Sequence, residues 1–132
     1  MSRRSLDACV LLLSLVATAS VHAAPPASVK SEIDYLLAKI GDAKCEFYRN
    51  GTWYDGARAV SHLQFKYGSL VSSHLISTTD DFIERAGSRS SLTGEAYMIR
   101  CGGGAPVTCA TWLRMQLAAY RDTSGALRDT RH

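Results

Sequence analysis

The fold is decided by the stretch Cys45-Glu46-Phe47-Tyr48-Arg49-Asn50-Gly51-Thr52-Trp53-Tyr54. It holds two short aromatic-rich runs on either side of Asn50-Gly51, and Asn-Gly is the strongest short-range signal for a two-residue hairpin. A type I′ turn at this dipeptide pairs Tyr48 with Trp53 across the two strands. The stretch therefore predicts a β-hairpin over residues 45–54 whose side chains sort onto two faces.

A further strand is predicted near residues 96–101, after a Ser/Gly-rich polar loop. If this strand joins the hairpin and Cys45 is bonded to Cys101, one face carries both cysteines. The other residues on that face are Phe47, Tyr54, Tyr97 and Ile99. The opposite face then shows Tyr48, Trp53, Met98 and Arg100.

Four segments have apolar residues at helical spacing or helix-capping signals, namely residues 29–40, 57–67, 79–86 and 109–120. Gly68 is predicted to end the second of these helices. The predicted fold class is α+β, with about four helices packed on a small antiparallel sheet, in one domain over residues 24–121. The polar residues 122–132 have little to bury and are predicted to form a mobile tail.

The first 23 residues have the three-part layout of a secretory signal peptide. Arg3 and Arg4 precede an apolar run over residues 8–19, and a cleavage point follows near Ala23. The apolar run is shorter than the roughly 20 residues that a membrane-spanning helix needs. We therefore predict a periplasmic or secreted protein with no transmembrane span after cleavage.

Cleavage would leave about 109 residues, which suits a single domain with one core. The leader holds two of the 15 basic and one of the 12 acidic residues, so the formal net charge falls from +3 to +2. Acidic and basic residues alternate along the chain without a run of like charge. This pattern argues against a nucleic-acid partner, because nucleic-acid binders carry a basic stripe.

Three cysteines remain after cleavage, an odd number for an oxidising compartment. A disulfide between Cys45 and Cys101 would tie distant segments, whereas one between Cys101 and Cys109 would close a short Gly-rich loop. We favour the long closure, which the chain-entropy estimate values at about 4 kcal/mol. One thiol is left over in either case.

Several segments together resemble the YfeK-like family of small secreted bacterial proteins. They are residues 32–37, the 45–54 hairpin, His62-Leu63 with Lys66-Tyr67, residues 81–83, the Ser/Gly loop to Tyr97, Arg100-Cys101 and Trp112-Leu113. The resemblance implies an exported bacterial protein and supports Cys45 and Cys101 as a pair. Because that family is expected to have a small hydroxyl residue at the position of Cys109, it also makes Cys109 the free thiol. It carries no catalytic residue across.

The candidate contact residues are Tyr48, Arg49, Trp53 and Arg100. Aromatic rings beside guanidinium groups suit stacking on a peptide, a glycan or an envelope protein. Two plainer interpretations stand beside this one. A helix covers the aromatic face, or the Arg49-Asn50 tip serves only the geometry of the turn.

The alternative function is a small cell-envelope hydrolase or thiol-dependent enzyme. His62, the hydroxyl-rich loop Ser88–Thr93 or Cys109 would supply its chemistry. The loop has no G-x-S-x-G elbow, and the cysteines have no Cys-x-x-Cys pair. No cluster of histidines and carboxylates has metal-ligand spacing, so neither a metal nor a cofactor is predicted. The leading hypothesis is a non-catalytic binding or accessory module.

Overall fold

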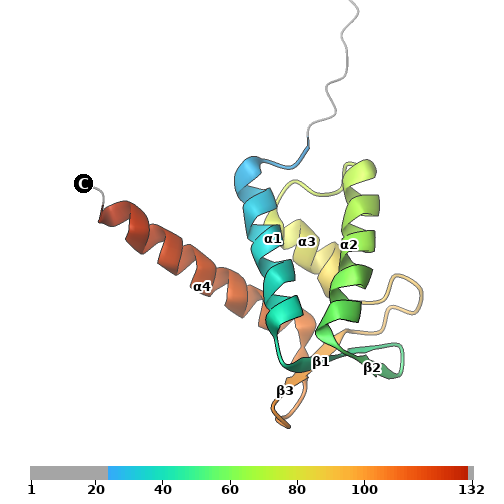
Figure 1. The fold of residues 1–132 in the computed structure, drawn as a ribbon. Coiled ribbons are helices and arrows are strands. Elements are labelled where there is room, and N and C mark those ends of the chain that lie inside the picture. Colours follow the sequence, from blue (N-terminus) through green and yellow to red (C-terminus); the bar gives the residue numbers. More distant parts are fainter. Residues whose placement is uncertain (1–23, 131–132) are drawn as a thin grey trace, which may run out of the picture.

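The computed structural model describes residues 24–130, so the predicted signal peptide 1–23 lies outside the described residues. The elements run in the order α1 (Ala27–Asp42), β1 (Cys45–Arg49), β2 (Thr52–Tyr54), α2 (Gly56–Ser72), α3 (Thr79–Phe82), η1 (Ile83–Gly87), β3 (Met98–Cys101), β4 (Val107–Thr108) and α4 (Cys109–Asp129). Here η1 is a π-helical turn that continues α3. Figure 1 shows helices gathered on one side of a small sheet, which confirms the predicted α+β fold.

The sheet is antiparallel with the strand order β2-β1-β3-β4. Tyr48 lies opposite Trp53 across the turn, as predicted. Asn50 and Gly51 take φ values of 48° and 86°, the positive dihedrals that a type I′ turn requires. The two-residue strand β4 was not predicted, because Thr108 has a second role as the N-cap of α4.

The hydrophobic core lies between the helices and the face of the sheet that carries Phe47 and Ile99. Phe47 contacts Trp112 of α4 edge-on, with 6.2 Å between ring centroids. The helices contribute fully buried side chains to the same core, among them Ile33, Leu36, Ile40, Phe82 and Leu113. Tyr97 and Ile99 share this face, as predicted from the hairpin register.

The disulfide joins Cys45 of β1 to Cys101 of β3. The two cysteines lie directly opposite each other in the antiparallel register, and their Cα atoms are 4.2 Å apart. Cys109 is a free, buried cysteine. The structure therefore confirms the long closure.

The prediction that Gly68 ends α2 is wrong, because the helix continues through it to Ser72. Leu70 and Val71, which follow Gly68, are partly buried against the core. Packing of these two side chains offsets the roughly 1 kcal/mol by which glycine disfavours a helix interior relative to alanine.

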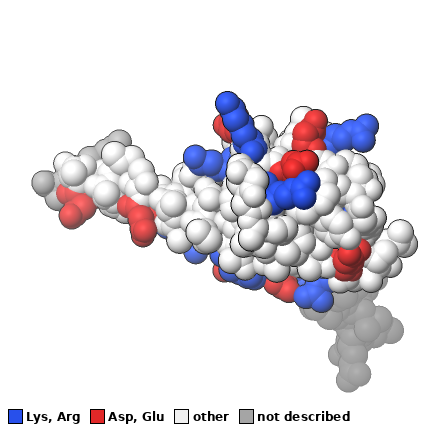
Figure 2. All heavy atoms as spheres, turned by 90° about the horizontal axis from the view of Figure 1, so that it is seen from below, with Lys and Arg blue, Asp and Glu red and all other residues white. Residues whose placement is uncertain are grey.

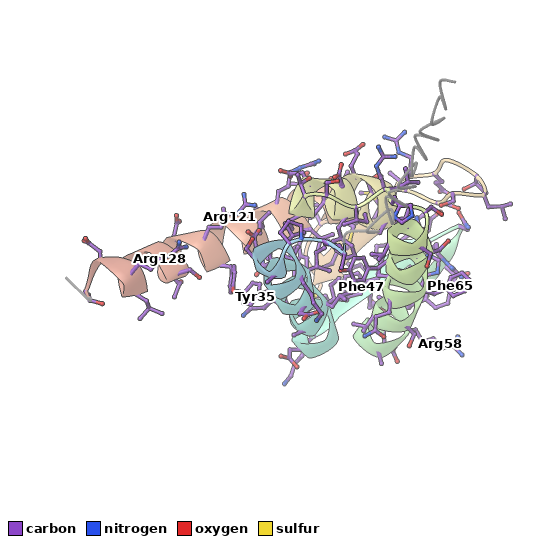
Figure 3. The ribbon with its side chains drawn as sticks, turned by 90° about the horizontal axis from the view of Figure 1, so that it is seen from above. Tyr35, Phe47, Arg58, Phe65, Arg121 and Arg128 are labelled. Carbon is purple, nitrogen blue, oxygen red and sulfur yellow. A yellow bond between two sulfur atoms is a disulfide. The ribbon has the colours of Figure 1, made fainter. Side chains whose placement is uncertain are left out.

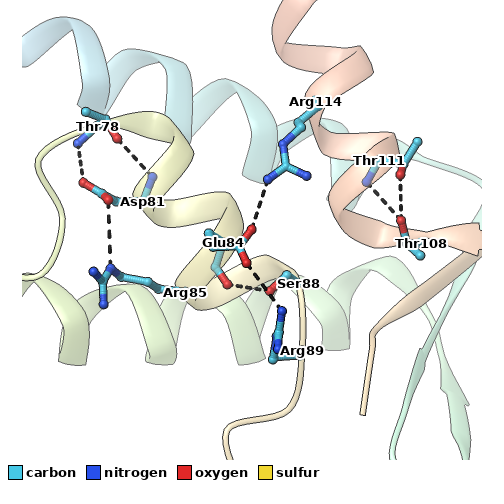
Figure 4. A network of polar contacts seen from close by, with 9 residues as sticks. All are labelled: Thr78, Asp81, Glu84, Arg85, Ser88, Arg89, Thr108, Thr111 and Arg114. Carbon is cyan, nitrogen blue, oxygen red and sulfur yellow. Dashed lines mark hydrogen bonds and ion pairs between the residues drawn. The ribbon is translucent and has the colours of Figure 1, made fainter. Parts of the chain in front are cut away.

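A capping box begins α3 (Figure 4). The Thr78 hydroxyl accepts from the backbone N–H of Asp81, and the Asp81 carboxylate accepts from the backbone N–H groups of Ser77 and Thr78. In η1, Glu84 forms ion pairs with Arg89 and with Arg114 of α4. These polar contacts attach the α3–η1 segment to the loop that follows it and to α4.

The last helix runs farther than predicted, to Asp129, and its final turns project from the body of the molecule (Figure 1). Almost every side chain from Asp122 to Thr130 is exposed, in agreement with the expectation that this segment has little to bury. The mobility predicted for residues 122–132 remains a prediction, and residues 131–132 lie outside the described part of the chain.

Candidate functional site

Four polar side chains from three parts of the fold meet at one side of the core. Arg49 is the last residue of β1, His62 and Lys66 lie one turn apart on α2, and Tyr97 immediately precedes β3. Because side chains alternate along a strand, Arg49 lies on the same face as Phe47 and points toward α2. We call these four residues the basic cluster.

The hydrogen-bond partners of His62 indicate which tautomer its neutral ring adopts. A guanidinium group only donates, so the Arg49 Nη1 atom, 2.7 Å from His62 Nδ1, requires that nitrogen to accept. The neutral ring then carries its proton on Nε2 and donates it to the Tyr97 hydroxyl oxygen at 2.9 Å. Lys66 Nζ donates to the same oxygen at 3.3 Å. The phenolic oxygen thus accepts two hydrogen bonds, and its own proton is left to be donated elsewhere.

The surroundings of the basic cluster shift the pKa values of His62, Lys66 and Tyr97 toward their neutral forms. Burial, followed by the charges of Arg49 and Lys66, lowers the pKa of His62. Burial and the charge of Arg49 also lower the pKa of Lys66, whose ammonium donates to the Arg89 carbonyl oxygen at 2.9 Å. Burial raises the pKa of Tyr97. A neutral phenol and a neutral imidazole therefore stand beside the guanidinium of Arg49.

The lowered pKa of His62 makes folding stability depend on pH. As the pH falls below about 6.5, the unfolded state binds a proton at His62 before the native state does. We therefore expect the free energy of unfolding to decrease as the pH falls from 7 to 5. The slope should correspond to a difference of less than one bound proton between the unfolded and native states. Urea unfolding across this range should show a shallower slope for His62→Gln than for the original chain. Equal pH slopes for the two proteins would contradict a lowered pKa of His62 in the native state.

Two hollows adjoin the basic cluster, and Arg49, His62 and Tyr97 line both. The first, of about 370 Å³, is walled mainly by apolar side chains. They include Phe47, Tyr54, Ala59 and Leu63, while Arg58 stands as a second guanidinium. The second, of about 520 Å³, lies between α2 and the loop after η1. The cluster thus faces two concave surfaces of a size that ligand sites commonly have.

None of the ion pairs formed by the described residues includes Arg49, Arg58 or Lys66. Arg49 instead rests on the ring of Tyr54, with 5.4 Å between its Cζ atom and the ring centroid. Only 9% of Lys66 is exposed, although buried lysines are usually paired with an acid. The hollows are therefore positively charged, which suits an anionic group.

The other predicted contact residues form a separate group on the opposite face of the sheet. Trp53 packs against Tyr48 at 5.4 Å between ring centroids, and the Arg100 guanidinium lies 3.9 Å from the centroid of Trp53. We call Tyr48, Trp53 and Arg100 the outer-face group. All three are half-buried, and the structure does not bring Arg49 to them.

Acidic residues neutralise the outer-face group. Arg100 Nε donates to Glu46 at 2.7 Å, and the Tyr48 hydroxyl donates to Glu95 at 2.7 Å. The Glu95 carboxylate raises the pKa of Tyr48, and Arg100 lowers the pKa of Glu46. Figure 2 shows basic and acidic side chains next to one another on the side of the molecule seen from below.

The hydroxyls of the Ser88–Thr93 loop hold the hairpin tip. Ser90 Oγ accepts from Asn50 Nδ2 at 3.1 Å, and the Thr93 hydroxyl donates to Asn50 Oδ1 at 2.8 Å. Asn50 therefore does more than form the turn. In the described part of the chain, the hydrogen bonds of His62 go to Arg49 and Tyr97, and neither partner is a carboxylate.

Cys109 lies at the start of α4 with 2% of its surface exposed. Burial raises the pKa of its thiol to about 12. Because the thiolate is the nucleophile, this environment suits an inert packing residue.

Within residues 24–130, no group of histidine, cysteine and carboxylate side chains is arranged to bind a metal ion. A search of the same residues found no helix with the length and apolar character that crossing a bilayer demands.

Comparison with known proteins gives a family model that matches residues 27–121, described as a family of unknown function, DUF5329. The chain belongs to the DUF5329 family. It is 37% identical over 87 residues to the uncharacterized protein YfeK of Salmonella typhimurium, covering 66% of this chain and 68% of that protein. The resemblance found in the sequence is thereby confirmed. No solved structure matches the chain.

The region matched to DUF5329 includes both groups of side chains and the disulfide, and it ends before the projecting turns of α4. Sequence reasoning missed Lys66 and Tyr97 as members of a site in this DUF5329 chain. The spacing of His62 and Lys66 places them on one side of α2, and the hairpin register places Tyr97 on the inner face. The sequence therefore contained both signals. That the side chains meet, however, depends on how α2 packs on the sheet.

Proposed function

We propose that this protein is an exported, non-catalytic binding module of the cell envelope, which holds a small anionic ligand at Arg49. The observation that carries the proposal is the basic cluster, where Arg49 faces the apolar hollow and none of the ion pairs of the described residues includes it. A carboxylate there would accept from the guanidinium of Arg49 and from the Tyr97 hydroxyl. Charge-assisted hydrogen bonds of this kind are about twice as strong as neutral ones.

The surroundings of His62 support binding over catalysis. A histidine that acts as a general base is commonly oriented by a carboxylate, which stabilises the imidazolium. Here a guanidinium contacts Nδ1, and burial together with the charge of that guanidinium lowers the pKa of the ring. We place the binding site at Arg49 and not at the outer-face group, because Glu46 already neutralises Arg100.

Export is supported by the signal-peptide pattern of residues 1–23 and by the disulfide, a bond that persists in oxidising compartments. Expression of the full chain in a bacterium should give a periplasmic protein with a new N-terminus near Ala24. Fractionation and intact-mass analysis check this. A cytosolic chain that retains its leader would overturn the export part of the proposal.

The binding part is tested by NMR titration of the disulfide-bonded protein with benzoate, a carboxylate with an apolar body, and with its neutral counterpart benzamide. We expect benzoate to bind at least ten-fold more tightly than benzamide and to shift the signals of the basic cluster. Arg49→Gln should abolish the preference. Arg128→Gln, on the projecting part of α4 (Figure 3), removes the same charge far from the hollow and should preserve it. Equal binding of the two probes would overturn the proposal.

A further inference from the structure

The second hollow combines charge with exposed apolar side chains. Phe65 of α2 is 78% exposed, and Leu92 of the loop after η1 is 89% exposed. Both line this hollow together with Lys66. Figure 3 shows Phe65 on the outer side of α2, away from the core residue Phe47. Single exposed apolar residues are common on protein surfaces. Two exposed apolar side chains that line the same positively charged hollow are typical of an interaction surface.

Polar groups lie between these apolar residues. The hydroxyls of Ser69 and Ser91 and the side chain of Asn50 line the same hollow. Apolar side chains interspersed with hydrogen-bonding groups match the alternation of side chains and amides along a peptide. An acyl chain would offer no hydrogen-bond partner to the hydroxyls of Ser69 and Ser91, at a cost in binding.

The loop that carries Leu92 is held in place. Ser90 accepts hydrogen bonds from Asn50 and from the backbone N–H groups of Leu92 and Thr93, at 3.1 to 3.3 Å. The backbone of Gly94 donates to the Ser90 carbonyl oxygen. This wall of the hollow is therefore organised before a ligand arrives, which lowers the entropic cost of binding.

We propose that the ligand is a peptide segment in which an acidic residue is followed by a large apolar residue. The carboxylate binds at Arg49, and the apolar side chain packs between Phe65 and Leu92 in the second hollow. Because Arg49, His62 and Tyr97 line both hollows, neighbouring residues of one peptide reach both. This inference rests on the proposed function and adds the class of ligand.

Three fluorescein-labelled hexapeptides test it by fluorescence anisotropy. The first contains Asp-Leu in a Gly/Ser background, the second Asn-Leu and the third Asp-Ser. We expect the Asp-Leu peptide to bind at least ten-fold more tightly than either of the others. Phe65→Ser and Leu92→Ser should remove the preference for leucine and leave benzoate binding unchanged. Met115→Ser, which replaces another exposed apolar residue, should change neither.

The possible results separate the two proposals. If benzoate binds at Arg49 but the Asp-Leu and Asp-Ser peptides bind equally, the peptide inference is overturned and the proposed function stands. If neither benzoate nor any peptide shows a dependence on Arg49, both are overturned. The protein could instead bind phosphatidylglycerol vesicles more tightly than the Asp-Leu peptide, with the same dependence on Phe65 and Leu92. That result would overturn the peptide inference in favour of binding to a membrane surface.

Discussion

Replacing both Cys45 and Cys101 with alanine is expected to lower the free energy of unfolding by about 4 kcal/mol. The disulfide closes a loop with a sequence separation of 56 residues, so it removes many conformations from the unfolded chain. A loss of this size is a large part of the stability of a small domain. Urea unfolding of the double variant and of the oxidised original chain measures the difference.

Cys109→Ala provides the control, because it removes the free cysteine and leaves the bridge intact. Its smaller effect reports only the packing of one buried side chain. A double variant as stable as the oxidised chain would contradict the assigned role of the bridge.

Phe82→Ala is expected to destabilise the protein by about 3 to 5 kcal/mol. Phe82 is fully buried and meets the ring of Tyr67 of α2 edge-on at 5.6 Å between centroids. Truncation leaves a cavity where α3 packs on α2, and the surrounding side chains fill it only in part. Thermal and urea unfolding followed by circular dichroism measure the loss.

Phe65→Ala is the matched control, since it makes the same chemical change at a side chain that is 78% exposed. We expect it to change stability by no more than about 0.5 kcal/mol. Similar losses for the two variants would show that the core is not centred where Phe82 lies. The same control separates folding from the binding role proposed for Phe65.

Local patterns predicted most of the fold. Asn50-Gly51 determines the hairpin register, and alternation along β1 and β3 determines which side chains face the core. The same alternation, followed one residue past Tyr48, would have separated Arg49 from Trp53. Predicted boundaries failed at Gly68 and beyond Tyr120, because helix ends depend on packing and on neighbouring turns.

The sequence by itself determined the pairing of the hairpin and the two faces of its strands, because both depend on short-range backbone geometry. The partnership of Cys45 with Cys101 was favoured over that of Cys101 with Cys109, and the pairing of β1 with β3 decided it by bringing together residues that are 56 positions apart. Only the tertiary structure decided that Arg49, His62, Lys66 and Tyr97 meet. Their convergence depends on the position of α2 against the end of β1 and the start of β3. That position is set by the burial of core side chains from all of these elements, which no local spacing in the chain encodes.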